Sequence, residues 1–317
     1  MARLFARSLI SVALCGLAGC PSSNEDDDGG SIGDGDGGSV GDGDGSGGGD
    51  ATGGGSNPGD GGPAGGSGDG NPGDDSTGGD PGPPPPGVAC DQSFEHEGYT
   101  GCLTEVGGLE IKFFPLPEGT PVQRLVVFFH GDTGVDWFEN WGFRPEILDW
   151  AYPQDMLVLG VKSPAAYPGD TEPSYGAAQP DDADVVTQSI EYFRDQYGVT
   201  ADQTLYWGVS GGSWFFTSSF IAVAGARMPG IFVANCGGSG GSFGWAWDPA
   251  TDTASRELDA LLLNYGDQDF LAPNAAASYQ EFLGMGFATE QIVYPGATHC
   301  DHPISEPTID FWADHLP

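Results

Sequence analysis

Residues 88–317 predict an α/β fold built on a doubly wound, mostly parallel sheet. Short apolar runs such as 124–129 and 156–161 carry no alternating polar positions, which is typical of strands buried on both faces. Between them lie amphipathic runs such as 181–197, where apolar residues recur on one helical face. Strands that alternate with helices favour parallel pairing, and functional residues are then expected at the carboxyl ends of the strands.

The individual elements follow from the same two patterns. Runs rich in β-branched and aromatic residues predict strands, and amphipathic runs predict helices, of which 181–197 has acids at its positively charged start. The expected strands are 109–114, 124–129, 156–161, 204–209, 231–234, 261–265 and 291–294, and the expected helices are 181–197, 213–224, 274–284 and 308–315.

The first residues have the pattern of an export signal. Arg3 and Arg7 precede an apolar run at 8–17 that is too short to span a bilayer, and Leu17-Ala-Gly-Cys20 follows. These four residues resemble a bacterial lipobox. The resemblance implies a signal peptide at 1–19, a lipidated Cys20 that binds a lipid membrane, and a place in the cell envelope, on its periplasmic or extracellular face.

Residues 20–87 predict a disordered linker after the lipidated cysteine. The segment from 21 to 87 holds 14 acids, no lysine or arginine, and almost no large apolar side chain. Such a composition cannot bury enough apolar surface to offset the entropy of folding. We therefore expect one folded domain, at 88–317.

The charge of the chain excludes some partners. The formal net charge is −37, and 32 acids against 7 bases remain after residue 87. Nucleic acid is excluded because a phosphate backbone requires a basic surface, and polyanionic substrates are disfavoured for the same reason. Neutral esters and glycans remain as substrate classes.

A serine at the end of a predicted strand is the candidate nucleophile. Gly208-Val-Ser210-Gly-Gly212 lies between the strand 204–209 and the helix 213–224, which is the strand–turn–helix context that G-x-S-x-G requires. The tight turn exposes the serine hydroxyl, and Gly211 offers its backbone N–H to an oxyanion.

The base and the acid are expected after later strands. His299 follows the strand 291–294 at a turn's distance, and His302 is its competitor. Asp269 follows the strand 261–265, with Asp267 as second choice. The order Ser210, Asp269, His299 is that of α/β-hydrolases, in which the carboxylate fixes the tautomer of the imidazole.

The second oxyanion donor is expected in the loop after the strand 124–129. Within His130-Gly-Asp-Thr-Gly134 we assign it to the amide of Asp132, with Thr133 as the alternative. The acidic side chain of Asp132 is unexpected beside an oxyanion and is predicted to point away from it.

From about residue 103 the chain resembles the α/β-hydrolase superfamily, especially secreted polyhydroxybutyrate depolymerases, feruloyl esterases and acetyl xylan esterases. The matching residues are Ser210 with its glycines, Asp269 in the stretch from Gly266 to Pro273, His299, and His130-Gly131. The resemblance implies a serine esterase without a cofactor or metal. Asp132 and Trp214 depart from that group.

Four cysteines, Cys90, Cys102, Cys236 and Cys300, remain after the leader and Cys20 are set aside, and an exported domain permits three pairings of them. Cys90 with Cys102 would close the start of the domain, and Cys236 with Cys300 would brace the loop of His299.

Aromatic residues follow two of the loops expected near the site. The sequence leaves two roles open for them: stacking on a sugar or aryl group of the substrate, or packing in the core. These residues are Trp137, Phe138, Trp141, Trp245 and Trp247.

The sequence thus predicts an exported, membrane-anchored serine hydrolase that cleaves a neutral carboxylic ester, an aryl or glycan ester among the candidates, through an acyl-enzyme on Ser210. Two alternatives stay open. One is a peptidase or acyltransferase with the same triad, and the other is a non-catalytic surface protein that binds glycans on a hydrolase fold.

Overall fold

The computed structural model describes residues 87–134, 137, 139–140, 142–239 and 259–316. The expected leader, Cys20 and the linker up to residue 86 lie outside these residues, and so do four of the aromatic residues singled out above, Phe138, Trp141, Trp245 and Trp247. Within the described part of the chain, no helix has the length and apolarity needed to cross a bilayer.

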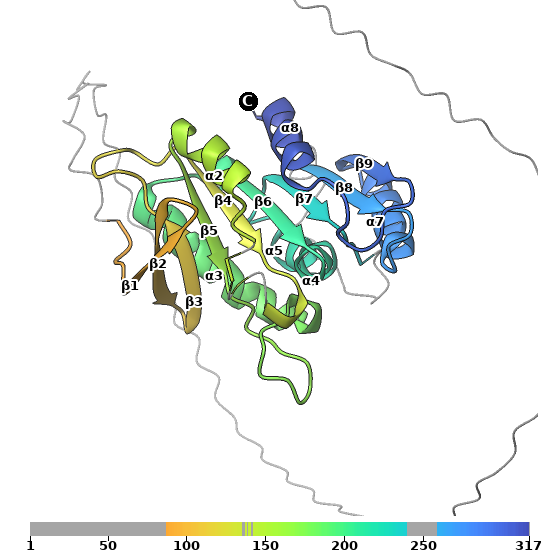
Figure 1. The fold of residues 1–317 in the computed structure, drawn as a ribbon, viewed down its shortest axis with the longest axis horizontal. Helices are drawn as coiled ribbons and strands as arrows, with labels where there is room; N and C mark the ends of the chain where they lie inside the picture. Colours follow the sequence, from red (N-terminus) through yellow and green to blue (C-terminus); the bar gives the residue numbers. More distant parts are fainter. Residues whose placement is uncertain (1–86, 135–136, 138, 141, 240–258, 317) are drawn as a thin grey trace, which may run out of the picture. The chain divides into compact units, whose positions relative to one another are not determined.

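A nine-stranded sheet forms the centre of the domain, with strand order β1-β2-β3-β5-β4-β6-β7-β8-β9 (Figure 1). The pairs that join β1, β2, β3 and β5 are antiparallel, and every pair from β5 to β9 is parallel. The predicted α/β class with a mostly parallel sheet is confirmed. The strands are β1 (Gln92–His96), β2 (Tyr99–Val106), β3 (Leu109–Phe114), β4 (Arg124–Phe129), β5 (Met156–Val161), β6 (Thr204–Val209), β7 (Ile231–Asn235), β8 (Ala260–Gly266) and β9 (Ala288–Tyr294).

All seven expected strands are present, and two more were missed. β5, β6, β7 and β8 are buried at every position, which explains their continuous apolar runs. The missed strands β1 and β2 lie at one edge, and their burial changes from residue to residue. An edge hairpin of this kind has no continuous apolar run to reveal it.

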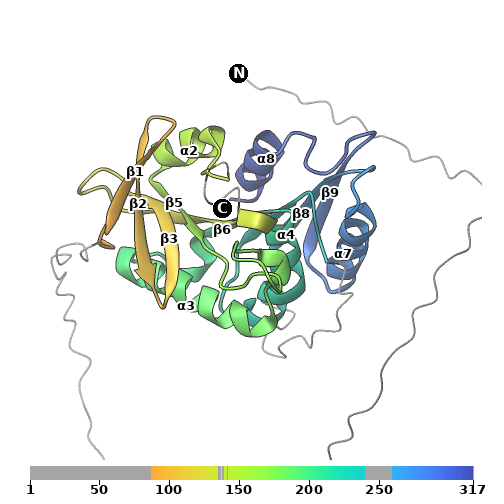
Figure 2. The ribbon, with the colours of Figure 1, turned by 60° about the horizontal axis from the view of Figure 1, so that its bottom comes forward.

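Helices cover both faces of the sheet (Figure 2). α2 (Pro145–Ala151) and α8 (Ser305–His315) pack on one face, where Trp150 stacks on Trp312 with the ring centroids 5.6 Å apart. α3 (Pro180–Tyr197), α4 (Gly211–Phe215), α5 (Ile221–Ala224) and α7 (Ala272–Gly284) pack on the other. The seven-residue α2 was missed because so short a helix shows little periodicity.

The helix expected at 213–224 differs from the prediction. It begins earlier, as α4, and a π-helical turn, η5 (Phe216–Phe220), separates α4 from α5. Thr217 Oγ1 donates to the carbonyl of Ser213 at 2.7 Å, and Ser218 donates to that of Phe215 at 3.3 Å. Hydroxyl groups that bond to the preceding turn compete with the helical ladder, and they occur where the helix widens.

The strand register brings the carboxyl ends of the central strands to one edge. Phe129 of β4 pairs with Gly208 of β6, and Val209 pairs with Asn235 of β7. Gly266 at the end of β8 pairs with Tyr294 at the end of β9. The loops after β4, β6, β8 and β9, which carry the predicted site residues, therefore start side by side.

Candidate active site

Ser210 lies in a strained turn between β6 and α4. Its φ of 52° and ψ of −114° are unfavourable for a residue with a side chain, and strain of this kind costs about 1–3 kcal/mol. The turn is held in place because the Ser210 amide donates to the carbonyl of Asn235 at 3.0 Å. This geometry raises the hydroxyl above the end of the sheet.

The two outer glycines of the motif are needed for close packing in this turn. A Cβ on Gly212 would lie 2.1 Å from the carbonyl oxygen of Phe129, and one on Gly208 would lie 2.7 Å from the amide of Ser213. Both obstacles are backbone atoms, which cannot swing aside. The sequence motif is therefore a packing requirement of the β6–α4 turn against the end of β4.

Three residues form a hydrogen-bonded chain at this turn. Nδ1 of His299 lies 2.9 Å from both carboxylate oxygens of Asp269, and Nε2 lies 2.9 Å from Ser210 Oγ. An ionised carboxylate can only accept, so Nδ1 carries the proton and donates to Asp269. Nε2 is then free to accept the hydroxyl proton of Ser210, as a general base requires.

The Asp269 carboxylate is fully buried and well supplied with donors. Besides His299, the amide of Leu271 donates to Oδ1 at 2.8 Å, which fixes the carboxylate just before α7. The ring of Phe270 lies against the imidazole with centroids 4.5 Å apart, although 71% of Phe270 is exposed. Phe270 therefore shields one face of the His299 ring from water.

The competing candidates have other partners. Nε2 of His302 lies 3.2 Å from the carbonyl of Asn264, and its ring stacks on Tyr294 at 4.9 Å. Burial lowers the pKa of His302. Asp267 accepts a hydrogen bond from the amide of Gly296 at 2.7 Å and so braces the turn that leads to His299. The geometry brings together Ser210, Asp269 and His299.

The two amides expected to bind an oxyanion, those of Gly211 and Asp132, both stand at the start of a helix. Gly211 is the first residue of α4, and Asp132 is the first residue of the short 3-10 helix η1 (Asp132–Gly134). Amides at the start of a helix have no carbonyl partner within it and point outward. Thr133, the alternative donor, has a left-handed backbone with φ of 66°.

His130 ties the loop after β4 to the loop after β5. Its ring is fully buried, Nδ1 donates to the carbonyl of Gly131 at 2.7 Å, and Nε2 accepts from the amide of Ser163 at 2.9 Å. Only a neutral imidazole can both donate and accept, and burial lowers the pKa of His130 to about 4. His130 thus shapes the loop of Asp132.

We expect His130 to make the fold sensitive to acid. Its pKa rises from about 4 in the folded state to the ordinary 6.5 on unfolding. The contribution of the neutral ring to the free energy of unfolding is therefore complete above pH 6.5 and is lost as the pH falls towards 4. The loss amounts to about 3 kcal/mol of unfolding free energy. The free energy of unfolding in urea is measured for wild type and for His130→Gln at pH 7 and at pH 4. The difference between the two proteins should change by this amount between the two pH values.

The comparison between the two proteins is needed because Asp259 titrates in the same pH range and changes the free energy of unfolding in the opposite direction. Burial raises the pKa of Asp259 to about 7, so its contribution is lost as the pH rises from 3.8 to 7. Asp259 is common to both proteins and cancels in the difference. A difference in unfolding free energy that stays constant between pH 7 and pH 4 would contradict the prediction.

Two disulfide bonds are present, with the pairings that the sequence favoured. Cys90 is bonded to Cys102 across a separation of 12 residues, and Cys236 to Cys300 across 64. The second bond joins the end of β7 to the residue that follows His299. It therefore holds the loop of His299 against the edge of the sheet that carries Ser210.

The two disulfides give a matched pair of stability predictions. From the loop lengths, replacing Cys236 and Cys300 by alanine should cost about 4 kcal/mol, and replacing Cys90 and Cys102 about 3 kcal/mol. Only the first change should also lower turnover, because only that bond adjoins His299. Unfolding by guanidinium and kcat are measured on both double variants, and equal kcat values would show that the bond does not position His299.

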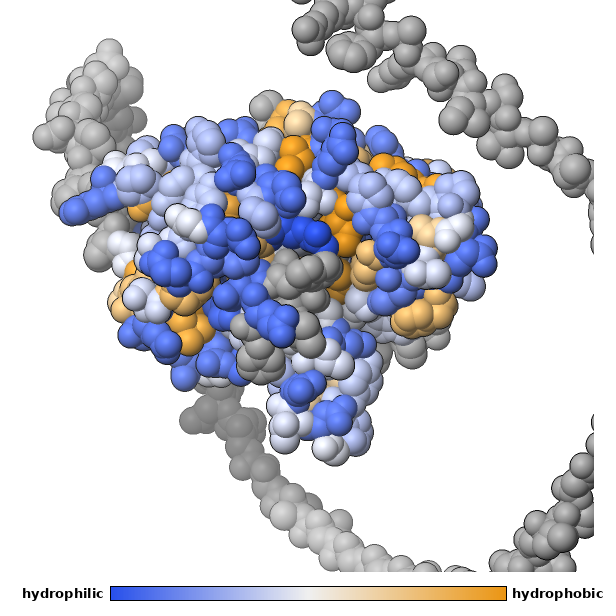
Figure 3. All heavy atoms as spheres, viewed as in Figure 1, coloured by the Kyte–Doolittle hydropathy of each residue, from blue (hydrophilic) through white to orange (hydrophobic). Residues whose placement is uncertain are grey.

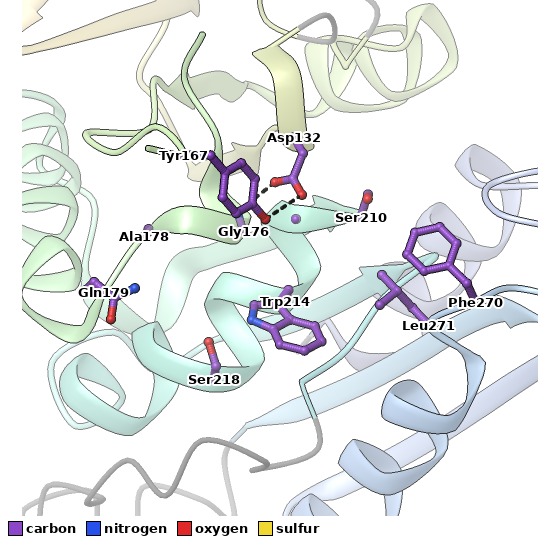
Figure 4. A pocket seen from close by; sticks show the side chains of 11 residues that line it. Asp132, Tyr167, Gly176, Ala178, Gln179, Ser210, Trp214, Ser218, Phe270 and Leu271 are labelled. Carbon is purple, nitrogen blue, oxygen red and sulfur yellow. Dashed lines mark hydrogen bonds between the residues drawn. The ribbon is translucent and has the colours of Figure 1, made fainter. Parts of the chain in front are cut away.

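A pocket of about 390 Å³ opens beside Ser210 (Figure 4). Asp132 and Tyr167 lie on one side of it, and Trp214, Phe270 and Leu271 lie on the other. The Asp132 side chain was expected to point away from the oxyanion, and in the structure it faces the segment 167–176. The carboxylate lines the pocket because donors from the segment 167–176 hold it there.

Of the aromatic residues that could stack on a substrate, the structure describes Trp137. It is 2% exposed and packs against Phe143 and His130, with Lys112 Nζ 5.0 Å from its ring centroid. Trp137 is therefore a core residue. Tyr167 was missed as a pocket residue, and Trp214 was noticed only as a departure from the resembled group.

Two exposed ring side chains of the described part of the chain, Phe270 and Tyr167, lie at the pocket. The face of the domain drawn in Figure 3 is mostly hydrophilic, with apolar residues in small patches. Phe270 is the most exposed large apolar side chain in the described part of the chain, and Tyr167 is 41% exposed. Both line the pocket beside Ser210.

Comparison with known proteins identifies the fold. No protein-family model matches the sequence, and no curated protein matches it. Among solved structures, a mutant of the esterase E40 superimposes with a TM-score of 0.50 at 13% identity, covering 69% of this chain and 84% of that one. The fold is that of the α/β-hydrolases. Two further structures resemble the chain less well.

One of them is a carboxylesterase from Bacillus cereus, with a TM-score of 0.49 at 10% identity, covering 66% of this chain and 95% of that one. The other is an esterase/lipase from an uncultured bacterium, with a TM-score of 0.49 at 12% identity, covering 70% of this chain and 86% of that one. At such identities the likeness concerns the fold and leaves the chemistry to the residues of the site.

Proposed function

We propose that this protein is a serine hydrolase that cleaves carboxylic esters through an acyl-enzyme on Ser210. The observation that carries the proposal is the chain of hydrogen bonds from Asp269 through His299 to Ser210, whose hydroxyl stands in a strained turn beside a pocket. Nucleophile, base and orienting carboxylate are each within hydrogen-bond reach of the next. The esterases among the structures of similar fold support an ester as the substrate.

The steps follow from this geometry. Ser210 Oγ attacks the ester carbonyl while its proton passes to Nε2 of His299, and the amides of Gly211 and Asp132 hold the oxyanion. His299 then protonates the leaving alcohol, which departs and leaves an acyl group on Ser210. Water, activated by the same imidazole, attacks the acyl group and releases the acid, and the proton returns to Ser210.

Hydrolysis of simple esters tests the proposal directly. We expect the purified full chain to hydrolyse p-nitrophenyl acetate and butyrate, with a burst of p-nitrophenol as the acyl-enzyme accumulates. A folded protein that hydrolyses neither ester would contradict it. In that case the peptidase, acyltransferase and surface-binding alternatives would be tested next.

We also propose that the protein is exported and anchored in the cell envelope through a lipid on Cys20. The lipobox-like Leu17-Ala-Gly-Cys20 after a short apolar run supports this, and the linker up to residue 87 would act as a tether between anchor and enzyme.

Replacing Cys20 tests the anchor. In a bacterial host, wild type should fractionate with membranes and carry acyl chains at Cys20, because buried methylenes hold it there. Cys20→Ser should lose the acyl chains and leave the membrane fraction. Mass spectrometry of the N-terminal peptide measures the modification, and Cys15→Ser is the control that should keep it. An unmodified Cys20 in the wild type would rule out the anchor.

A further inference from the structure

We propose that the pocket beside Ser210 selects its esters by charge and favours a cationic group such as a quaternary ammonium, with Asp132 as the specificity residue. The inference rests on the proposed esterase function and names the substrate class. It starts from a carboxylate at a place where the developing oxyanion makes negative charge unfavourable.

The Asp132 carboxylate has no positively charged partner among the described residues. Its carboxylate accepts from Ser174 Oγ at 2.5 Å, the amide of Gly176 at 2.8 Å and the Tyr167 hydroxyl at 3.1 Å. All three donors are neutral, and Asp132 forms no ion pair with any described lysine, arginine or histidine. The donors fix the position of the charge without cancelling it.

Two glycines leave room for this carboxylate. A Cβ on Gly211 would lie 2.0 Å from Oδ1 of Asp132, and a Cβ on Gly176 would lie 2.6 Å from both carboxylate oxygens. The carboxylate thus rests directly against the residue that follows the nucleophile. Any group bound there is within a few ångströms of the charge, where electrostatic attraction is strong.

Aromatic rings complete the surroundings of a cation. The ring of Tyr167 and those of Trp214 and Phe270 lie on opposite sides of the pocket (Figure 4). The faces of such rings attract ammonium groups, and the attraction grows when the cation leaves bulk water. One fixed carboxylate with rings on two sides is a combination that suits a bulky cation.

The hydrogen bonds of Asp132 favour a cation over a sugar hydroxyl. Two donors already occupy Oδ1 and a third occupies Oδ2, so little of the carboxylate's accepting capacity is left for further directional bonds. A quaternary ammonium needs only proximity to the charge and contact with the rings. The excess of acids in the chain also draws cations towards the domain and keeps anions away.

Matched esters that differ only in charge test the proposal. For the alcohol side, butyrylcholine is compared with 3,3-dimethylbutyl butyrate, in which carbon replaces the charged nitrogen. For the acyl side, p-nitrophenyl 4-(trimethylammonio)butyrate is compared with its neutral 5,5-dimethylhexanoate analogue. We expect kcat/KM of the full chain to favour the cationic ester roughly tenfold or more in at least one pair. In Asp132→Asn this ratio should fall close to one.

Asp170→Asn is the matched control. Asp170 is exposed in the same loop as Tyr167, and its side chain does not line the pocket. This variant removes the same charge and should keep the wild-type ratio. The inference would be overturned by a kcat/KM ratio near one in the wild type, or by an equal drop in kcat/KM for both esters of a pair in Asp132→Asn. Hydrolysis of the neutral esters would in that case still support the esterase function. Failure to hydrolyse any of these esters would overturn both.

Discussion

Ser210→Ala should lower kcat for ester hydrolysis by roughly 10⁵- to 10⁶-fold, the loss that follows removal of the nucleophile from a triad that acts as a unit. Without Oγ no acyl-enzyme can form, and the remaining groups can only bind the substrate and polarise it. The substitution removes one oxygen, so the fold should survive. The measurement is kcat with p-nitrophenyl butyrate together with the midpoint of thermal unfolding.

Ser305→Ala provides a control for the same chemical change elsewhere. Ser305 lies at the start of α8 and donates to Glu146, with no contact to the pocket. Its kcat should match that of wild type. If Ser210→Ala kept more than about one part in a thousand of the wild-type kcat, another group would have to be the nucleophile.

Asp269→Asn should lower kcat by about 10⁴-fold while KM changes little. The carboxylate accepts from Nδ1 of His299, and this leaves Nε2 free to take the proton of Ser210. An amide can donate to Nδ1 instead, which moves the ring proton to Nε2 and removes the base. The substrate pocket is unchanged, so the loss should appear in kcat.

Asp267→Asn is the matched control because it makes the same change two residues earlier. Asp267 bonds to the Gly296 amide and makes no contact with the His299 ring, so its loss of kcat should stay below about tenfold. Steady-state kinetics on both variants decide between the two acids. A larger loss in Asp267→Asn than in Asp269→Asn would reverse the assignment.

The features that the sequence predicted share one physical origin. Central strands buried on both faces must be continuously apolar, so β4 to β8 were visible as runs, and the ends of such runs marked where functional residues gather. Ser210 and Asp269 each follow one of these runs, and His299 follows the edge strand β9, whose burial changes from residue to residue. Their hydrogen-bonded geometry agrees with a triad that was selected from the G-x-S-x-G motif, the order of the three residues and their places after predicted strands.

The features that were missed depend on contacts between segments far apart in the chain. Tyr167 lies in a loop without periodicity, and its place in the pocket comes from a bond to Asp132. The direction of the Asp132 side chain depends on Ser174 and Gly176, more than 40 residues away. No local pattern encodes such a contact, so the sequence could not reveal that this carboxylate lines the pocket.

Covalent labelling tests directly whether Ser210 is an activated nucleophile. The full chain is treated with a fluorophosphonate probe, and its intact mass is measured beside Ser210→Ala. We expect one adduct per chain in the wild type, located on Ser210 by peptide mapping, and none in the variant. A folded wild type without an adduct, or an adduct that persists in Ser210→Ala, would contradict it.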